Sequence, residues 1–79
     1  MNITLYSLSD YNNGNLIPFT IELDGLTEEE YRAEIAENLA RITEEQADGE
    51  LREEWIVCDT DGVPSKYVGE YDLDSKFFA

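Results

Sequence analysis

The chain has 79 residues and carries nineteen Asp and Glu against five Lys and Arg, which gives a formal net charge of -14 at pH 7. This charge excludes direct binding to nucleic acid or to an anionic membrane surface, and it favours a basic partner. The length predicts one domain, and the single cysteine excludes an intramolecular disulfide. Because 42% of the residues are hydrophobic and 11% are aromatic, we expect a folded domain and not a disordered acidic tail.

The first part of the chain predicts two strands joined as a hairpin. Residues 3–9 alternate in the way of a strand, and the turn formers of residues 10–15 follow. Residues 16–23 form the second expected strand, in which Pro18 lacks an N–H and predicts an edge position or a bulge. We expect the 10–15 loop to be mainly structural, with Gly14 supplying the positive φ of its turn.

A long helix is expected over residues 28–46. Thr27 followed by Glu30 matches a capping box, and Leu26 with Tyr31 can form a hydrophobic staple. Its ion pairs are expected between Glu28 and Arg32 and between Glu37 and Arg41. The expected apolar stripe is Tyr31, Ile35, Leu39 and Ile42, with Ala33, Ala36 and Ala40 filling in.

The last part of the chain predicts a strand over residues 55–59, then a turn at residues 60–64. Residues 66–71 are expected to be a fourth short strand or an extended tail. Cys58 is expected to be a small core residue. The residues expected to pack on the helix stripe are Leu5, Phe19, Ile21 and Trp55.

The fold class predicted from this order is α+β, with a small antiparallel sheet of three to four strands and one long helix packed on one face. The order of elements is β-β-α-β, in a single domain of residues 1–79.

Acidic side chains are the candidate binding residues. On a helix, carboxylates three or four positions apart lie about 5–6 Å from each other, which is close to the spacing of backbone phosphates. A solvated helix face and adaptation to high salt are the alternative explanations for the same charge. The candidate phosphate-mimicking residues are Glu28, Glu30, Glu34, Glu37, Glu44, Glu45, Asp48, Glu53, Asp59, Asp61 and Glu70.

Metal and catalytic chemistry have little support in the sequence. Asp59, Asp61 and Glu70 have the spacing of calcium ligands in an EF-hand loop, but Pro64 stands where that loop needs glycine. Glu53 and Glu54 adjoin Trp55, as carboxylates do in some glycosidases, yet neighbouring strand residues point apart. With no histidine and no glycine-rich phosphate loop, we expect no enzyme and no cofactor.

Several segments together resemble the N-terminal domain of the ArdA antirestriction family. They are Leu8-Ser9-Asp10-Tyr11-Asn12-Asn13-Gly14, Glu53-Glu54-Trp55-Ile56-Val57-Cys58-Asp59, then Gly62, then Gly69-Glu70-Tyr71. The resemblance implies an acidic DNA mimic, carried by phages or mobile elements, that occupies the DNA-binding groove of type I restriction-modification enzymes. The family has three domains, and the resemblance covers one of them, so a smaller target such as a CRISPR effector also fits.

The sequence therefore predicts a DNA mimic that occupies the DNA-binding cleft of a host defence complex, either a CRISPR-Cas effector or a type I restriction-modification enzyme. The alternative is a non-catalytic phage structural or adaptor module that docks a basic partner unrelated to DNA. We expect a monomer or weak homodimer in the host cytoplasm. The expected partner is a basic DNA-binding protein, with no direct binding to nucleic acid or membrane.

Overall fold

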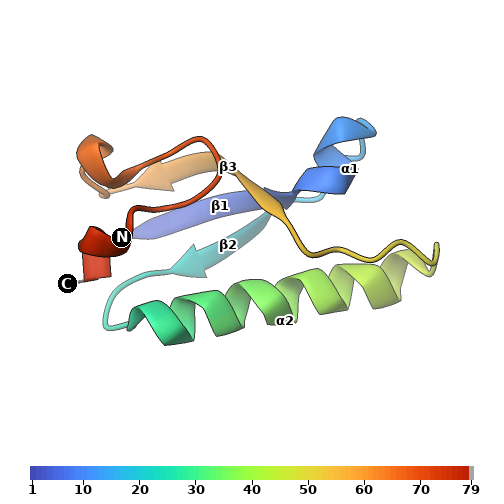
Figure 1. The fold of residues 1–79 in the computed structure, drawn as a ribbon, viewed down its shortest axis with the longest axis horizontal. Helices are drawn as coiled ribbons and strands as arrows, with labels where there is room; N and C mark the ends of the chain where they lie inside the picture. Colours follow the sequence, from blue (N-terminus) through green and yellow to red (C-terminus); the bar gives the residue numbers. More distant parts are fainter. Residues whose placement is uncertain (79) are drawn as a thin grey trace.

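A three-stranded antiparallel sheet forms one layer of the molecule, and one long helix forms the other (Figure 1). The computed structural model describes residues 1–78. Its elements are β1 (Asn2–Ser7), α1 (Leu8–Asn12), β2 (Phe19–Glu22), α2 (Glu28–Gln46) and β3 (Trp55–Asp61), followed by 3-10 turns at Ser65–Tyr67 and Ser75–Phe78. The strand order is β2-β1-β3, so the predicted α+β fold with a helix on a small antiparallel sheet is confirmed.

The predicted bounds of α2 are confirmed, and its first turn closes as the capping box requires. The Glu30 N–H donates to Thr27 Oγ1 at 3.2 Å, and the Thr27 N–H donates to Glu30 Oε1 at 3.0 Å. At the other end Ala47 adopts a left-handed conformation with φ of 49°. Both ends are therefore fixed by local backbone geometry.

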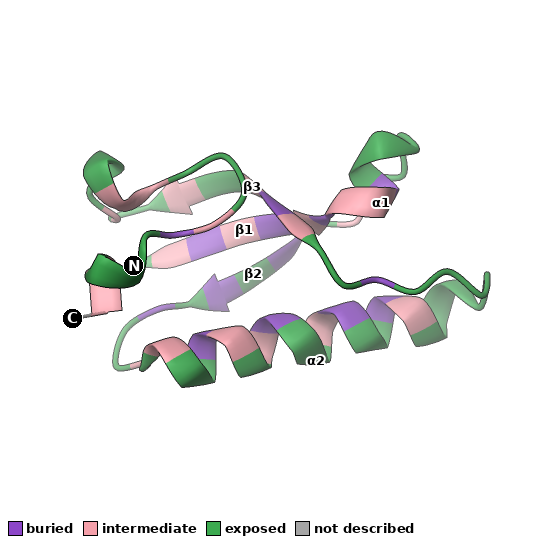
Figure 2. Ribbon diagram, in the orientation of Figure 1, coloured by how far each residue is buried: buried purple, intermediate pink, exposed green. Residues whose placement is uncertain are grey.

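The hydrophobic core lies between α2 and the sheet. The helix stripe is buried along its length, as the banding of α2 in Figure 2 shows. The buried core residues on the two layers are Ile3, Leu5, Phe19, Ile21, Tyr31, Ile35, Leu39 and Ile42, with Trp55 partly buried against them. Ala33, Ala36 and Ala40 are exposed, so the expectation that they fill in the stripe is wrong. They lie beyond its edge on the helix circumference.

A β-bulge in the pairing of β1 with β3 decides which β3 residues enter the core. Thr4 pairs with Asp59 and Leu5 with Val57, which leaves Cys58 as an extra residue. Val57 therefore packs on the core, while Cys58 is exposed. The prediction that Cys58 is a core residue is wrong, because the extra residue breaks the simple alternation of the strand.

The expected hairpin forms, but its strands are shorter than predicted. β1 ends at Ser7 because Leu8–Asn12 turns into the short helix α1. β2 begins only at Phe19, directly after Pro18. Gly14 has the positive φ expected of it, at 74°. Of the two alternatives expected for residues 66–71, the fourth strand does not form, since a 3-10 turn and a single bridge between Val68 and Leu73 occupy that region.

Two networks of charged side chains tie the loops to these layers. In the first, the Arg52 side chain is 0% exposed and donates to Asp10 at 2.6 and 2.9 Å and to Asp48 at 2.9 Å. Asp10 lies in α1, and its side chain is 6% exposed. Arg52 thus joins α1 to the connection between α2 and β3, and its hydrogen bonds lower the pKa of Asp10.

The second network fastens the C-terminal segment to the first turns of α2. The Tyr31 hydroxyl donates to Asp72 at 2.7 Å, and Arg32 donates to Asp72 at 2.9 Å and to Glu28 at 3.1 Å. Ser75 Oγ donates to the same Glu28 carboxylate at 2.7 Å. Burial, followed by the Asp72 hydrogen bond, raises the pKa of Tyr31, and the Ser75 and Arg32 hydrogen bonds lower that of Glu28.

Candidate functional site

The eleven candidate carboxylates do not share one face of the molecule. Five of them follow one side of α2, and we call this set the acidic flank: Glu30, Glu34, Glu37, Glu44 and Glu45. Asp59 and Asp61 lie on the opposite side of the sheet, because they pair with Thr4 and Asn2 and not with the core residues of β1. A single flat partner surface therefore contacts one group or the other.

Ion pairs within the chain engage three of the eleven. Glu28 pairs with Arg32, Glu45 with Arg41, and Asp48 with Arg52. The hydrogen bonds from Arg52 lower the pKa of Asp48 to about 2. The predicted pair between Glu37 and Arg41 is wrong, because the Arg41 guanidinium contacts Glu45, one turn further along α2, at 3.1 Å.

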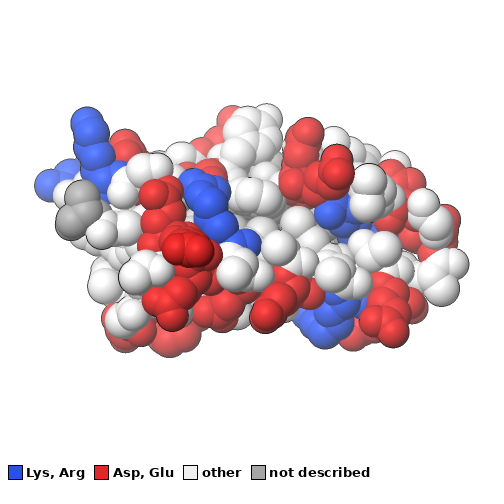
Figure 3. Space-filling model, turned by 60° about the horizontal axis from the view of Figure 1, so that its bottom comes forward, with Lys and Arg blue, Asp and Glu red and all other residues white. Residues whose placement is uncertain are grey.

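The centre of the acidic flank carries carboxylates without partners. The side chains of Glu34, Glu37 and Glu44 form no hydrogen bond or ion pair within residues 1–78. The Glu30 carboxylate also belongs to the capping box, where it accepts the Thr27 N–H. Figure 3, which brings the α2 side forward, shows Asp and Glu side chains spread over most of this face, among uncharged side chains and a few Lys and Arg.

The sheet face turned away from α2 has a neutral centre. The Thr4 and Thr20 hydroxyls lie 2.9 Å apart, and the rings of Tyr6 and Tyr11 stack at 5.9 Å between centroids. The neighbouring Cys58 thiol raises the pKa of Tyr6. Asp59 and Asp61 stand at one edge of this face, so they do not extend the acidic flank.

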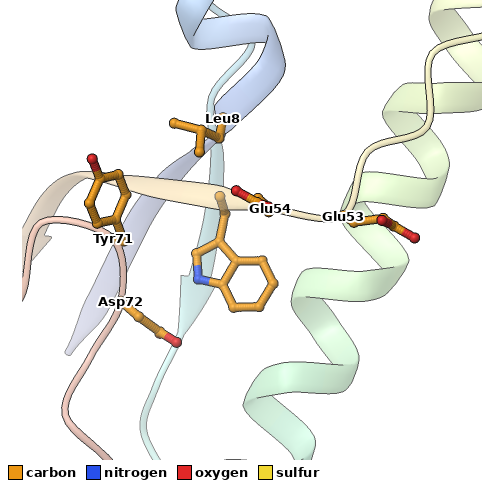
Figure 4. Close-up of a pocket in the computed structure, with 6 residues that line it drawn as sticks. Leu8, Glu53, Glu54, Tyr71 and Asp72 are labelled. Atoms are coloured by element: carbon orange, nitrogen blue, oxygen red, sulfur yellow. The ribbon is translucent and has the colours of Figure 1, made fainter.

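A second surface of interest surrounds the segment 51–55, where three hollows adjoin. The first, of about 430 Å³, is lined by Leu8, Glu53, Glu54, Trp55, Tyr71 and Asp72, and we call it the Trp55 pocket. Figure 4 shows Leu8, Glu54, Tyr71 and Asp72 around this space, with Glu53 toward α2. The other two, of about 270 and 530 Å³, also contain Leu51 and Glu53 in their linings.

Part of the Trp55 pocket is predictable from the sequence and part of it is not. Glu53 was a candidate binding residue, while Glu54 and Tyr71 were not. Tyr71 is 52% exposed and Leu51 is 72% exposed, and both side chains line these hollows. The Glu-Glu-Trp run was the available signal, but the contribution of Tyr71 depends on how the C-terminal segment folds back.

Two further observations concern the described part of the chain. Among residues 1–78, no group of three or more His, Cys, Asp or Glu side chains is placed to hold a metal ion. None of the helices in that range is long and apolar enough to cross a bilayer.

Comparisons of the chain with protein-family models, with curated proteins and with solved structures gave no match. The likeness to the ArdA family therefore remains a prediction from the sequence segments that carry it.

Proposed function

We propose that this chain is a non-catalytic inhibitor that imitates the charge of DNA and occupies the DNA-binding cleft of a defence complex. The target is a CRISPR-Cas effector or a type I restriction-modification enzyme. Binding is stoichiometric: carboxylates take the places of phosphates in the basic cleft and exclude the duplex.

The acidic flank of α2 is the observation that supports this function most directly. From Glu30 to Glu44 it runs for about 21 Å at the usual helical rise. That length equals about six base-pair steps of 3.4 Å. Glu34, Glu37 and Glu44 have no partner within residues 1–78, so a cationic surface can engage them without breaking an internal ion pair.

The distribution of charge over the whole chain gives further support. Seven of the nineteen carboxylates form ion pairs with an arginine or with the N-terminal amine, and the other twelve form none within residues 1–78. Unbalanced charge of one sign repels itself within a folded domain. A basic cleft relieves this repulsion, and the relief adds to the attraction between the two proteins.

A competition experiment tests the proposal. A fluorescent duplex is bound to a purified type I enzyme or to a guide-loaded CRISPR effector, and fluorescence anisotropy is measured as the protein is added. We expect displacement of the duplex, and the concentration for half displacement should rise in proportion to the duplex concentration. The protein alone should not change the anisotropy of the free duplex. Failure to displace the duplex from any complex of either class, or inhibition that excess duplex does not relieve, would contradict mimicry.

The second candidate function is that of a non-catalytic adaptor that docks a basic partner unrelated to DNA. The Trp55 pocket favours it, because imitation of phosphates requires no apolar hollow. Tyr71 and Leu51 present exposed apolar surface of the kind found in compact protein interfaces. No displacement of the duplex from any of these complexes, together with tight binding to a basic protein that holds no DNA, would select this candidate.

A further inference from the structure

We infer that the Trp55 pocket is a socket for an arginine side chain of the protein partner. The inference rests on the proposed function only for the basic character of that partner. The socket provides a contact that phosphate mimicry does not supply, and it lies at the junction of α1, β3 and the C-terminal segment.

The lining of the pocket has the chemistry that a guanidinium group requires. Two aromatic side chains, Trp55 and Tyr71, and three carboxylates, Glu53, Glu54 and Asp72, stand around a space of about 430 Å³ with Leu8. No Lys or Arg is among the lining residues. Arginine stacks on aromatic faces and pairs with carboxylates through its planar donors, which lysine does less well.

The carboxylates of the pocket differ in their availability. Asp72 already accepts hydrogen bonds from Tyr31 and Arg32. Glu53 and Glu54 are exposed, and their side chains have no ion pair or hydrogen bond within residues 1–78. The unbalanced charge of the pocket is therefore that of Glu54, with Glu53 at the rim toward α2, and it complements a cation.

The backbone holds these walls in place before any partner binds. The Leu8 N–H donates to the Glu54 carbonyl at 3.0 Å, and the Val57 N–H donates to the Glu70 carbonyl at 2.9 Å. The first bond fixes α1 against the start of β3, and the second fixes the segment that carries Tyr71. A preformed socket binds with less loss of conformational entropy than one that must assemble.

Trp55 is the only tryptophan of the chain, so its fluorescence reports directly on the pocket. The full-length protein is titrated with Nα-acetyl-arginine amide at constant ionic strength, and with Nα-acetyl-citrulline amide, which has nearly the same shape and no charge. We expect a saturable change with the arginine probe and at least about tenfold weaker binding of the citrulline probe. The indole N–H resonance of Trp55 in ¹H-¹⁵N spectra should shift over the same range of arginine concentration.

Variants separate the pocket from general charge. Glu53→Gln combined with Glu54→Gln should weaken binding of the arginine probe at least about fivefold, and Tyr71→Ala about threefold. The matched control, Glu34→Gln with Glu37→Gln, removes the same charge from the acidic flank and should change it less than about twofold. Equal binding of citrulline, equal weakening by the control pair, or no saturable change would overturn the inference.

The test contains neither DNA nor a defence complex, so it fails independently of the proposed function. Binding of the arginine probe without displacement of DNA in the competition experiment removes the mimicry proposal and leaves the socket. Displacement of DNA without binding of the arginine probe removes the socket and leaves the mimicry proposal.

Discussion

Arg52 donates two hydrogen bonds to Asp10 from a fully buried position, although 42 residues separate the two in the chain. The pair joins α1 to the segment that leads into β3. It therefore holds together two walls of the Trp55 pocket, since Leu8 lies in α1 and Glu53 directly follows Arg52.

Replacement of Asp10 by asparagine should destabilise the protein by about 3 kcal/mol at pH 7, because the buried guanidinium then loses one of its two carboxylates. The pKa of Asp10 is below its ordinary value of 3.8, since Arg52 donates hydrogen bonds to it. Its contribution to stability is thus fully present above about pH 4 and is lost as the pH falls through 3.8 and then through the folded-state pKa.

Urea unfolding of parent and variant at several pH values between 7 and 2 measures this loss. The difference between the two free energies of unfolding should shrink as the pH falls below 4. Asp61→Asn, at an exposed position, is the control and should change stability by less than about 0.5 kcal/mol. A constant difference across the whole pH range would show that the Asp10 charge is not the cause.

Leu39→Ala should lower the free energy of unfolding by about 2–5 kcal/mol, because Leu39 is 3% exposed in the core between α2 and the sheet. In a domain of this size such a loss approaches the total stability. Thermal unfolding by circular dichroism measures it, with Leu51→Ala at a 72% exposed position as the control. Equal melting temperatures for the two variants would contradict the inward position of Leu39.

Gly14→Ala should destabilise the protein by about 1–2 kcal/mol. Gly14 has φ of 74°, and the added methyl group meets no atom within 4 Å, so the cost is conformational and not steric. Affinity for the partner should change little once the variant is folded, because the turn is structural. A variant of parental stability with lost binding would instead make residues 10–15 a contact loop.

Three changes on the acidic flank, Glu34→Gln, Glu37→Gln and Glu44→Gln, should weaken partner binding strongly in combination and only modestly one by one. Glu30 is left intact because its carboxylate closes the capping box. The matched triple variant alters the other surfaces, with Asp59→Asn, Asp61→Asn and Glu70→Gln. Affinities of both at low and high salt discriminate between the surfaces, since exposed charges are screened by salt. A larger effect of the second triple would move the interface away from α2.

Arg41→Gln should strengthen binding, because Arg41 is the only basic side chain within the acidic flank of α2. Its ion pair with Glu45 is about half exposed on both sides, so stability should change by no more than about 1 kcal/mol. The duplex competition experiment gives the readout, and the half-displacing concentration should fall. A rise would mean that Arg41 itself contacts the partner.

The sequence predicts those parts of the structure that depend on neighbouring residues. The capping box at Thr27 and the periodic stripe fix α2 to within a residue, because both act over one or two helical turns. The apolar and β-branched residues of β2 and β3 predict that these segments are strands, but they do not predict where each strand begins and ends. The bulge at Cys58 is not predictable from neighbouring residues because it depends on the pairing of β1 with β3. The short helix α1 is not predictable either, since Arg52 and the Glu54 carbonyl, both distant in the sequence, hold it.

In the candidate site, too, the features set by neighbouring residues are predictable from the sequence, and those set by distant residues are not. The carboxylates of α2 were assigned correctly to its surface, since helical periodicity places them there. The burial of Arg52 and Asp10 was not foreseen, because no local pattern distinguishes a buried arginine from the solvated ones. Tyr71 was missed for the same reason, as it reaches Trp55 only when the C-terminal segment folds back over β3.

Of the three strands, β1 comes first in the chain, lies in the centre of the sheet and pairs with the last of the three, β3. Half of the backbone ladder of β1 therefore has no partner until Asp61 has left the exit tunnel. Pairing between such distant segments slows folding, since a long loop must close before any contact is gained. The sheet is thus incomplete on one side until residues 55–61 have been made, and the folding of this domain waits for them.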